Sequence, residues 1–215
     1  MSDQISLFPE ENKTNDEQIN LPHSDIKLYP QFFDPVTSDN IFEKLKQEIN
    51  WQQEYIKIYG KENPVPRLTA WYGDRGYSYT YSGIRMNPES WTETLLLVKH
   101  KIETIAQVNF NSVLLNFYRD GNDGVAWHSD DEKELGKNPV IGSVSFGGKR
   151  RFSFKSRDKM QTKKYDLNLG NGDFLLMQGE TQSYWYHQIP KTKKTVFPRI
   201  NLTFRVIYPE LIVKK

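Results

Sequence analysis

The stretch Arg199-Ile200-Asn201-Leu202-Thr203-Phe204-Arg205 alternates polar and apolar residues without a break. Successive side chains on a strand point to opposite faces, so this alternation predicts a strand with one polar and one apolar face. Two guanidinium groups, an amide and a hydroxyl share the polar face: Arg199, Asn201, Thr203 and Arg205. A guanidinium offers a fixed fork of donors that matches a carboxylate, so this face suits a small dicarboxylate. For the strand taken alone, a solvent-facing surface with ordinary ion pairs is the simpler interpretation.

More strands are expected in the second half of the chain. Short runs of strand-forming residues separated by Gly-containing turns lie at 113–118, 140–146, 151–155, 164–169, 173–177, 184–187 and 200–208. Many short strands of this kind indicate an α+β, mainly β fold. The arrangement they favour is a double-stranded β-helix, or jelly roll, in which helices buttress one of two sheets.

Two amphipathic helices are expected before these strands. One begins after a cap at Ser38 and the other near Ser90, and each repeats apolar residues at helical spacing. These positions are Ile41, Phe42, Leu45 and Ile49 in the first helix, and Leu95, Val98, Ile102 and Ile105 in the second. One apolar face on each helix predicts that both pack against a sheet.

Composition limits the class of protein. We expect a disordered polar leader at residues 1–25 and one domain at 26–215, with its jelly-roll core at 111–208. The chain has no cysteine, which excludes disulfides, zinc–thiolate sites and cysteine nucleophiles. No apolar run is long enough to cross a bilayer, and the N-terminus has no signal-peptide pattern. The expected protein is a soluble, intracellular monomer.

Two histidines and an aspartate suggest a metal site. His128 and Asp130 are two residues apart, so they share a face on an extended strand, and His187 can complete a set of three ligands. Two imidazoles and one carboxylate leave open positions on an octahedral ion, as in non-haem Fe(II) oxygenases. The other two of the four histidines, His23 and His100, have no carboxylate two residues away.

An amide and a phenol lie in an otherwise apolar strand just before the metal triplet. Asn116 and Tyr118 point to the same side of the run 113–118. Buried polar groups need partners, so these two either satisfy each other and the backbone or face a ligand. A turn at Gly121-Asn122-Asp123-Gly124 then leads into Trp127-His128-Ser129-Asp130, so the strand feeds into the metal site.

Taken together, these motifs resemble those of the AlkB family of Fe(II)- and 2-oxoglutarate-dependent nucleic-acid demethylases. The similarity runs from about Ile58 to Ile207, with the greatest likeness to the human-type branch that repairs double-stranded DNA. The motifs, in chain order, are YGDRGYSYTYSG, NFY, WHSDDE, SYWYH and PRINLTFR.

The resemblance implies a role for each matching residue. His128, Asp130 and His187 match the iron ligands, and the 2-oxoglutarate pocket is matched by Asn116, Tyr118, Arg199, Asn201, Thr203 and Arg205. The implied reaction uses Fe(II), 2-oxoglutarate and O2 to oxidise the N-methyl group of 1-methyladenine or 3-methylcytosine in DNA. Succinate, CO2 and formaldehyde are released, and the metal and cosubstrate carry the chemistry.

The resemblance also implies a nucleotide-recognition segment within residues 26–110. An enzyme acting on a base in a duplex must flip that base out and hold it by stacking and edge contacts. Tyr81 matches the residue that stacks on the flipped base opposite His128, and Tyr79 matches its pocket neighbour. Tyr59 matches an aromatic finger that enters the gap in the duplex. The branch has phenylalanine where this chain has Tyr81, and tyrosines at this spacing are also ordinary strand formers.

An acidic residue follows the metal triplet. Glu132 matches an acidic pocket position of the family, where a carboxylate favours a base that methylation has made cationic. In the competing interpretation, Asp131, Glu132 and Glu134 form a solvated charged turn.

Local charge gives two candidate contacts with phosphates. The net charge is only +2, but Lys149-Arg150-Arg151 and the lysines at 191, 193 and 194 are basic clusters beside the main motifs. Each could equally be a solvated loop. Whether these clusters contact phosphates or are solvated loops, the expected partner is DNA with alkylated bases.

A short motif in the leader suggests a protein partner. Gln4-Ile5-Ser6-Leu7-Phe8 resembles the peptide by which bacterial repair proteins dock on the replication sliding clamp. Folding back of this segment on its own domain is the alternative. A real clamp motif would imply a bacterial, cytoplasmic protein, and otherwise an intracellular location that includes the nucleus is expected.

Two other functions remain open from the sequence. One is demethylation of RNA by an enzyme of the same family, and the other is 2-oxoglutarate-dependent hydroxylation of a protein or small molecule. The second would keep the iron triad and the arginines but would not need the tyrosine-rich segment 77–81.

Overall fold

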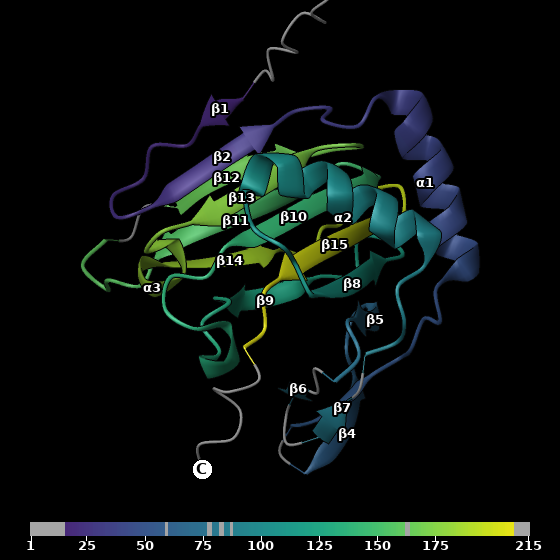
Figure 1. Cartoon of the computed structure of the whole chain (residues 1–215). Coiled ribbons are helices and arrows are strands. Elements are labelled where there is room, and N and C mark those ends of the chain that lie inside the picture. Colours follow the sequence, from purple (N-terminus) through teal and green to yellow (C-terminus); the bar gives the residue numbers. More distant parts are fainter. Residues whose placement is uncertain are drawn as a thin grey trace, which may run out of the picture.

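Two antiparallel sheets and two long helices form the body of the protein (Figure 1). The structure is a computed structural model that describes residues 16–58, 60–76, 79–81, 84–86, 88–161 and 164–208. The predicted leader motif at 4–8, Tyr59 and Tyr77 lie outside the described residues, and the side chains of Tyr79 and Tyr81 are not described.

The larger sheet has seven strands. Its order is β1 (Glu17–Gln18), β2 (Asp25–Tyr29), β13 (Phe174–Gln178), β10 (Ile141–Gly147), β15 (Arg199–Arg205), β8 (Ser112–Tyr118) and β5 (Leu68–Gly73). The smaller sheet has four strands in the order β12 (Lys164–Leu169), β11 (Arg150–Ser156), β14 (Trp185–Ile189) and β9 (Val125–His128). Strands that are neighbours in one sheet are often distant in sequence, as expected for a jelly roll, so the predicted fold class is confirmed.

The core consists of two apolar layers, one on each face of the larger sheet. Helices α1 (Pro35–Glu48) and α2 (Glu93–Ala106) cover the outer face, where Leu45 and Ile102 pack against Leu202 and Phe204 of β15. Between the sheets, Ile141 of β10 packs among side chains of the smaller sheet, including Phe154. The apolar face predicted for β15 therefore lies under the helices, and its polar face lies between the sheets.

Both helices begin at caps other than those predicted. Asp34 caps α1, since its carboxylate accepts a hydrogen bond from the Thr37 N–H at 3.0 Å. Ser38 lies inside the helix and donates to the Phe33 carbonyl. Thr92, rather than Ser90, caps α2 by accepting from the Leu95 N–H. Both errors have one cause: several residues that can cap a helix stand close together before each one.

Two segments differ from the expected strands. The last strand ends at Arg205 and not at Tyr208, because the backbone N–H and C=O of Ile207 form hydrogen bonds with the side-chain amide of Asn111 instead of with a neighbouring strand. Tyr184 belongs to the short helix α3 (Thr181–Tyr184) instead of β14.

Residues 16–25, which were predicted to belong to a disordered leader, are ordered. Residues 17–18 form β1, and the side chain of Ile19 is buried between the sheets. The Trp185 indole donates to the Pro22 carbonyl at 2.8 Å. Residues 16–25 therefore belong to the folded domain, because a single buried isoleucine and backbone pairing are enough to fix a segment that is otherwise polar.

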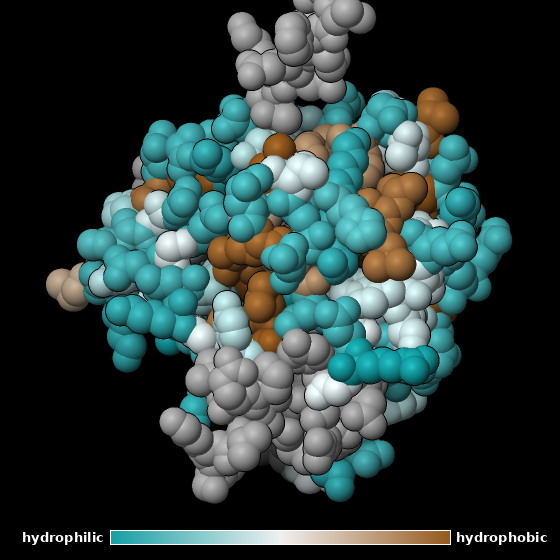
Figure 2. All heavy atoms as spheres, in the orientation of Figure 1, coloured by the Kyte–Doolittle hydropathy of each residue, from teal (hydrophilic) through white to brown (hydrophobic). Residues whose placement is uncertain are grey.

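Two short hairpins project from the lower end of the molecule in Figure 1: β3 (Tyr55–Ile58) with β4 (Lys61–Pro64), and β6 (Tyr79–Tyr81) with β7 (Ile84–Met86). On the face seen in Figure 2, hydrophilic residues cover most of the surface and hydrophobic residues gather in a few groups. Among the described residues, no helix combines the length and the apolar character needed to cross a bilayer.

Candidate metal and cosubstrate site

Three candidate ligands converge between the two sheets. His128 ends β9, Asp130 follows it by two residues, and His187 lies on the neighbouring strand β14, where it is paired directly with His128. One potential ligand atom from each residue can be chosen so that all three lie within 4.8 Å of one another. Asp130 and His187 are only 2% and 4% exposed. Two imidazoles and a carboxylate in this arrangement fit an Fe(II) ion that keeps positions open for other ligands.

The surroundings hold both imidazoles ready to bind a cation. The Nδ1 atom of His128 lies 2.9 Å from the Ala126 carbonyl, which can only accept, so this contact leaves Nε2 with its lone pair free. Burial lowers the pKa of His187 to about 3, and the charge of His128 acts in the same direction. His187 is therefore neutral at physiological pH, as a metal ligand must be.

Arg205 holds the carboxylate of the triad. Its guanidinium donates to Asp130 Oδ1 at 2.5 Å, and His187 Nε2 lies 3.6 Å from the other oxygen. Burial alone would raise the pKa of Asp130, but the nearby Arg205, with the two histidines, holds this pKa well below its usual range. The carboxylate is thus ionised and fixed in orientation.

Arg199 occupies the opposite end of the same strand face. Its guanidinium is 1% exposed, lies 5.3 Å from the Tyr118 ring centroid and donates to Ser145 Oγ at 2.9 Å. Its Nε and Nη1 atoms are buried without a hydrogen-bond partner. Burial lowers the pKa of Arg199 to about 10, so it remains a cation. A buried cation with unused donors fits a carboxylate ligand.

The polar residues between the two arginines bind each other. Thr203 Oγ1 donates to Asn201 Oδ1 at 3.1 Å, and Asn201 Nδ2 donates to Ser143 Oγ and the Val144 carbonyl. These hydrogen bonds satisfy the Asn201 amide and fix the orientation of Asn201 and Thr203.

A cavity of about 370 Å³ contains the triad. Most of the predicted cosubstrate residues also line it: Asn116, Tyr118, Asn201, Thr203 and Arg205. Arg199 does not line it directly and lies against Tyr118, which does. Metal ligands at one end and an unsatisfied cation beyond the other fit 2-oxoglutarate, whose 2-oxo acid group can chelate a metal while its distant carboxylate meets a guanidinium.

Comparison with known proteins agrees with this geometry. A sequence model of the 2OG-Fe(II) oxygenase superfamily matches residues 25–205. The mouse alpha-ketoglutarate-dependent dioxygenase alkB homolog 3 is 42% identical over 195 residues, which cover 87% of this chain and 68% of that protein. The human DNA oxidative demethylase ALKBH2 is 38% identical over 196 residues, which cover 87% of this chain and 74% of that protein. The chain belongs to the AlkB family of these oxygenases.

The predicted family is thereby confirmed, together with Fe(II) and 2-oxoglutarate as the cofactor and cosubstrate of an AlkB-type dioxygenase. The similarity extends both to alkB homolog 3 proteins and to ALKBH2 proteins. The solved structure of OsALKBH1 matches with a TM-score of 0.63 at 18% identity, covering 88% of this chain and 99% of that chain. At that identity the match supports the fold alone.

Glu132 lies between the cavity that contains the triad and a second cavity. It contributes to the wall of the triad cavity and to that of a neighbouring cavity of about 160 Å³ beside β5. Its Oε2 atom is buried without a hydrogen-bond partner. Asp131, by contrast, is exposed and pairs with Arg157. The charged turn thus has one carboxylate directed inward and one outward.

Arg67 is a cavity residue that the sequence did not reveal. Its Nε donates to Asn116 Oδ1 at 2.6 Å and its Nη1 to the Gly124 carbonyl at 3.3 Å. Asn116 is therefore oriented with its oxygen toward Arg67. Ser143 and Ser145 on β10 were missed as well, although their period-two spacing in Ser143-Val144-Ser145 was a usable signal. For Arg67 no local pattern existed.

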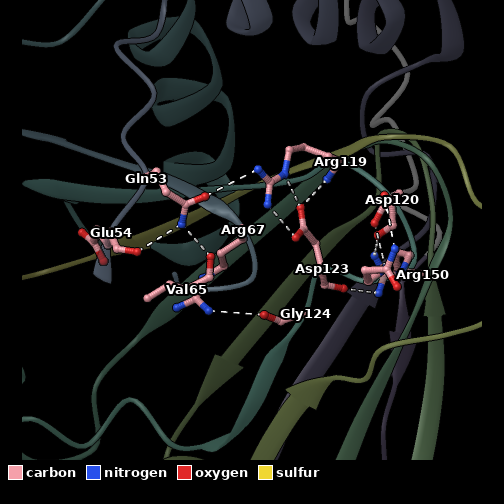
Figure 3. Close-up of polar contacts among 10 residues, drawn as sticks. Gln53, Glu54, Val65, Arg67, Arg119, Asp120, Asp123, Gly124 and Arg150 are labelled. Carbon is pink, nitrogen blue, oxygen red and sulfur yellow. Dashed lines mark hydrogen bonds and ion pairs between the residues drawn. The ribbon is translucent and has the colours of Figure 1, made fainter. Parts of the chain in front are cut away.

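A polar network ties the cavity wall to the neighbouring loops (Figure 3). Arg119 donates to both carboxylate oxygens of Asp123, and its Nη1 lies 3.5 Å from Gln53 Oε1. Gln53 in turn donates to the Val65 carbonyl at 2.8 Å. The chain before the β3–β4 hairpin is thereby linked to the turn that precedes β9.

One predicted phosphate contact is wrong. Arg150 is 3% exposed and donates to the carbonyls of Asp120, Asp123 and Pro190, so it anchors loops from inside. Lys149 and Arg151 beside it are exposed. The sequence could not separate them, because inward and outward positions on a strand carry the same residue type here.

Proposed function

We propose that this AlkB-family enzyme repairs DNA by oxidative demethylation of 1-methyladenine and 3-methylcytosine. The observation that carries the proposal is the Glu132 carboxylate, which has a buried, unpartnered oxygen on the wall of the cavity that contains the iron triad. The mouse and human relatives named DNA oxidative demethylase ALKBH2 are 37% and 38% identical to the chain over the aligned residues, which supports the choice of substrate.

The chemistry of the lesion explains the need for this carboxylate. Methylation at N1 of adenine or N3 of cytosine fixes a positive charge on the ring. A carboxylate in a partly desolvated wall attracts such a ring much more than a neutral one, since charges interact strongly away from water. Arg67 and Arg205 line the same cavity, so Glu132 also offsets local positive charge.

The residues of the chain divide the remaining tasks. His128, Asp130 and His187 hold the metal, while Asn116 and Arg199 bind the two-ended cosubstrate. When bound, Fe(II) and 2-oxoglutarate would supply the oxidation of the N-methyl group by O2, with succinate and CO2 as coproducts. The hydroxymethyl group would then lose its hydroxyl proton to solvent and leave as formaldehyde, and the electrons of its N–C bond would return to the ring and restore the neutral base.

Charge removal at Glu132 tests the proposal. Glu132→Gln should lower kcat/KM by about tenfold for a 3-methylcytosine oligonucleotide and by much less for neutral ethenoadenine, since tenfold corresponds to about 1.4 kcal/mol. Glu134→Gln makes the same charge change in the same loop, outside both cavities, and serves as the matched control. Equal losses on both lesions would refute the role of Glu132.

The aromatic residues of the recognition segment are part of the same proposal. Tyr81 stacks on the flipped base, Tyr79 lies beside it and Tyr59 fills the gap in the duplex. Tyr59→Ala should then reduce repair of duplex DNA more than repair of a single strand. An equal loss of repair on duplex and single-stranded DNA would contradict the role of Tyr59 in filling the gap.

The leader contributes a docking motif in this proposal, with Leu7 and Phe8 entering a groove on the replication sliding clamp. Capture by purified clamp should be lost in the double variant Leu7→Ala, Phe8→Ala. Unchanged capture would contradict this assignment without affecting the enzymatic one.

A further inference from the structure

The outer face of the smaller sheet carries a row of cations and aromatic rings. Lys164 on β12 is paired with Lys155 on β11, and Lys155 is paired with Tyr186 on β14. Trp127, on the edge strand β9, extends this row. Residues that alternate with these, including Phe154 and His187, point inward. The row therefore runs across all four strands.

The side chains in this row contact each other closely. Lys155 Nζ lies 4.9 Å from the Trp127 ring centroid and 5.5 Å from that of Tyr186. Lys164 Nζ lies 5.6 Å from the Trp127 centroid, and the Arg157 guanidinium lies 4.9 Å from that of Tyr186. Each positive group thus has an aromatic neighbour, and such cation–π contacts are weakly attractive at exposed sites.

The two lysines are not neutralised. Lys155 and Lys164 stand directly opposite each other, and like charges at such positions repel. Arg151 on the same strand is paired with Asp166, and Arg157, which directly follows the strand, is paired with Asp131. Across the part of the chain that the structure describes, neither lysine has an ion-pair partner. The face therefore combines unpaired positive charge with flat rings.

This face is continuous with the active site. Trp127 precedes the iron ligand His128 and also lines the triad cavity. Arg157 joins the two regions, since it donates to Ser129 Oγ at 3.3 Å and to Asp131 at 2.6 Å. A polymer with one unit in the cavity can therefore place its next units on the outer face without leaving the protein surface.

We propose that the outer face of the smaller sheet binds a single-stranded stretch of the nucleic-acid substrate next to the lesion. Bases stack on Trp127 and Tyr186, and phosphates contact Lys155 and Lys164. Only a nucleic acid supplies both regularly spaced negative charges and flat rings, and a single strand leaves those rings free to stack. This inference extends the proposed function by defining the path of the strand beyond the damaged base.

Binding of an undamaged strand tests the surface without relying on catalysis. Fluorescence anisotropy with a labelled single-stranded 15-nucleotide oligothymidine gives Kd at several salt concentrations. In Lys155→Gln plus Lys164→Gln, the slope of log affinity against log salt should fall by about 1.4, at about 0.7 per phosphate contact. Tyr186→Leu keeps the apolar cover but removes a ring and should weaken binding about fivefold or more.

A matched double variant controls for charge. Lys44→Gln plus Lys46→Gln removes two exposed charges from α1, which covers the outer face of the larger sheet and not the smaller one. This double variant should leave the slope unchanged. Equal changes in both double variants, or no change in either, would overturn the proposal. Binding of polyphosphate as tightly as oligothymidine would also overturn it, because the rings would then contribute nothing.

Turnover separates this proposal from the proposed function. With 3-methylcytosine in the 15-nucleotide strand, the Lys155→Gln plus Lys164→Gln variant should have a KM raised about fivefold or more. With the same lesion in a trinucleotide, too short to reach the face, the variant and the wild-type enzyme should agree. Absence of demethylation in every enzyme would refute the proposed function, and the oligothymidine result would still decide the binding surface.

Discussion

Arg199 and Arg205 stand at opposite ends of one strand face, about 20 Å apart along β15, yet their surroundings differ in kind. Arg199 is buried beside Tyr118 and Ser145, with two donor atoms unused. Arg205 is bonded to Asp130, a residue of the iron triad. The residue type is the same, but Arg199 has buried donor atoms without a partner, whereas Arg205 is bonded to a candidate metal ligand.

This difference bears on the prediction that the polar face of the strand suits a small dicarboxylate. Among the described residues, Arg205 forms an ion pair with Asp130, whereas no ion pair with a carboxylate is found for Arg199. We therefore expect Arg199 to contribute mainly to cosubstrate affinity, and Arg205 mainly to the charge and orientation of Asp130. Variants at the two ends should consequently fail in different assays.

The largest effect on the cosubstrate is expected at Arg199. Arg199→Ala should raise the KM for 2-oxoglutarate by about a hundredfold, because two charge-assisted hydrogen bonds are lost. Arg199→Lys keeps the charge without the fork and should fall between this variant and the wild type. Succinate formation at varied 2-oxoglutarate measures both, with circular dichroism to verify folding. An unchanged KM for 2-oxoglutarate in Arg199→Ala would contradict the role expected for Arg199 in binding the cosubstrate.

At the other end, metal affinity is the sensitive quantity. Arg205→Gln should weaken binding of Co(II), used as a probe for Fe(II), by about tenfold to a hundredfold, as for other groups that orient a metal ligand. The cobalt absorption band reports the titration directly. Arg157→Gln is the control, since Arg157 bonds Asp131 and not Asp130. If Arg205→Gln changed only the KM for 2-oxoglutarate, the division between the arginines would be wrong.

A smaller effect is expected from Arg67, because it would act on the cosubstrate only by positioning Asn116. Arg67→Lys removes the Nε donor to Asn116 and should raise the KM for 2-oxoglutarate about fivefold, the worth of one hydrogen bond, with kcat nearly unchanged. Arg119→Lys, in the network outside the cavity, should leave this KM at the wild-type value. Identical behaviour of the two variants would argue against positioning by Arg67.

The smallest effect should appear in stability alone. Burial would raise the pKa of Asp123, but hydrogen bonds from the Arg119 side chain and backbone outweigh it and hold the pKa below its usual range. Such a carboxylate stabilises the fold above its ordinary pKa near 4, and this contribution is lost as the pH falls through the lower folded value.

Asp123→Asn should accordingly lower Tm by about 2–4 °C at neutral pH and make the decline of Tm toward pH 3 shallower. Thermal unfolding between pH 7 and pH 3 measures this, with Asp120→Asn in the same turn as the control. A parallel pH profile in wild type and Asp123→Asn would show that the pair with Arg119 does not contribute.

The sequence predicted the parts of the protein that depend on local periodicity. Alternation in 199–205 correctly gave a strand, and the spacing of His128 and Asp130 correctly brought them to one side near His187. Pairing of β15 between β10 and β8 was not predictable, because hydrogen bonds between distant strands leave no local signature.

The same limit explains what was missed in the site. Arg67 meets Asn116 only because β5 pairs with β8 in the larger sheet. Arg150 was assigned to the surface because its neighbours are basic, whereas its position on β11 directs it inward to three carbonyl groups. Both cases depend on which side chain meets which across the fold, and that is decided by tertiary packing.

We propose above that this AlkB-family protein demethylates DNA bases by an iron- and 2-oxoglutarate-dependent oxidation. The most direct measurement incubates the enzyme with Fe(II), 2-oxoglutarate and single-stranded DNA containing 3-methylcytosine, and scores restored cytosine and formaldehyde together. We expect equal amounts of both, and neither product when 2-oxoglutarate is omitted or when His128→Ala replaces the wild type. Succinate formation by the iron-loaded enzyme without restoration of 3-methylcytosine or 1-methyladenine in any DNA substrate would contradict it.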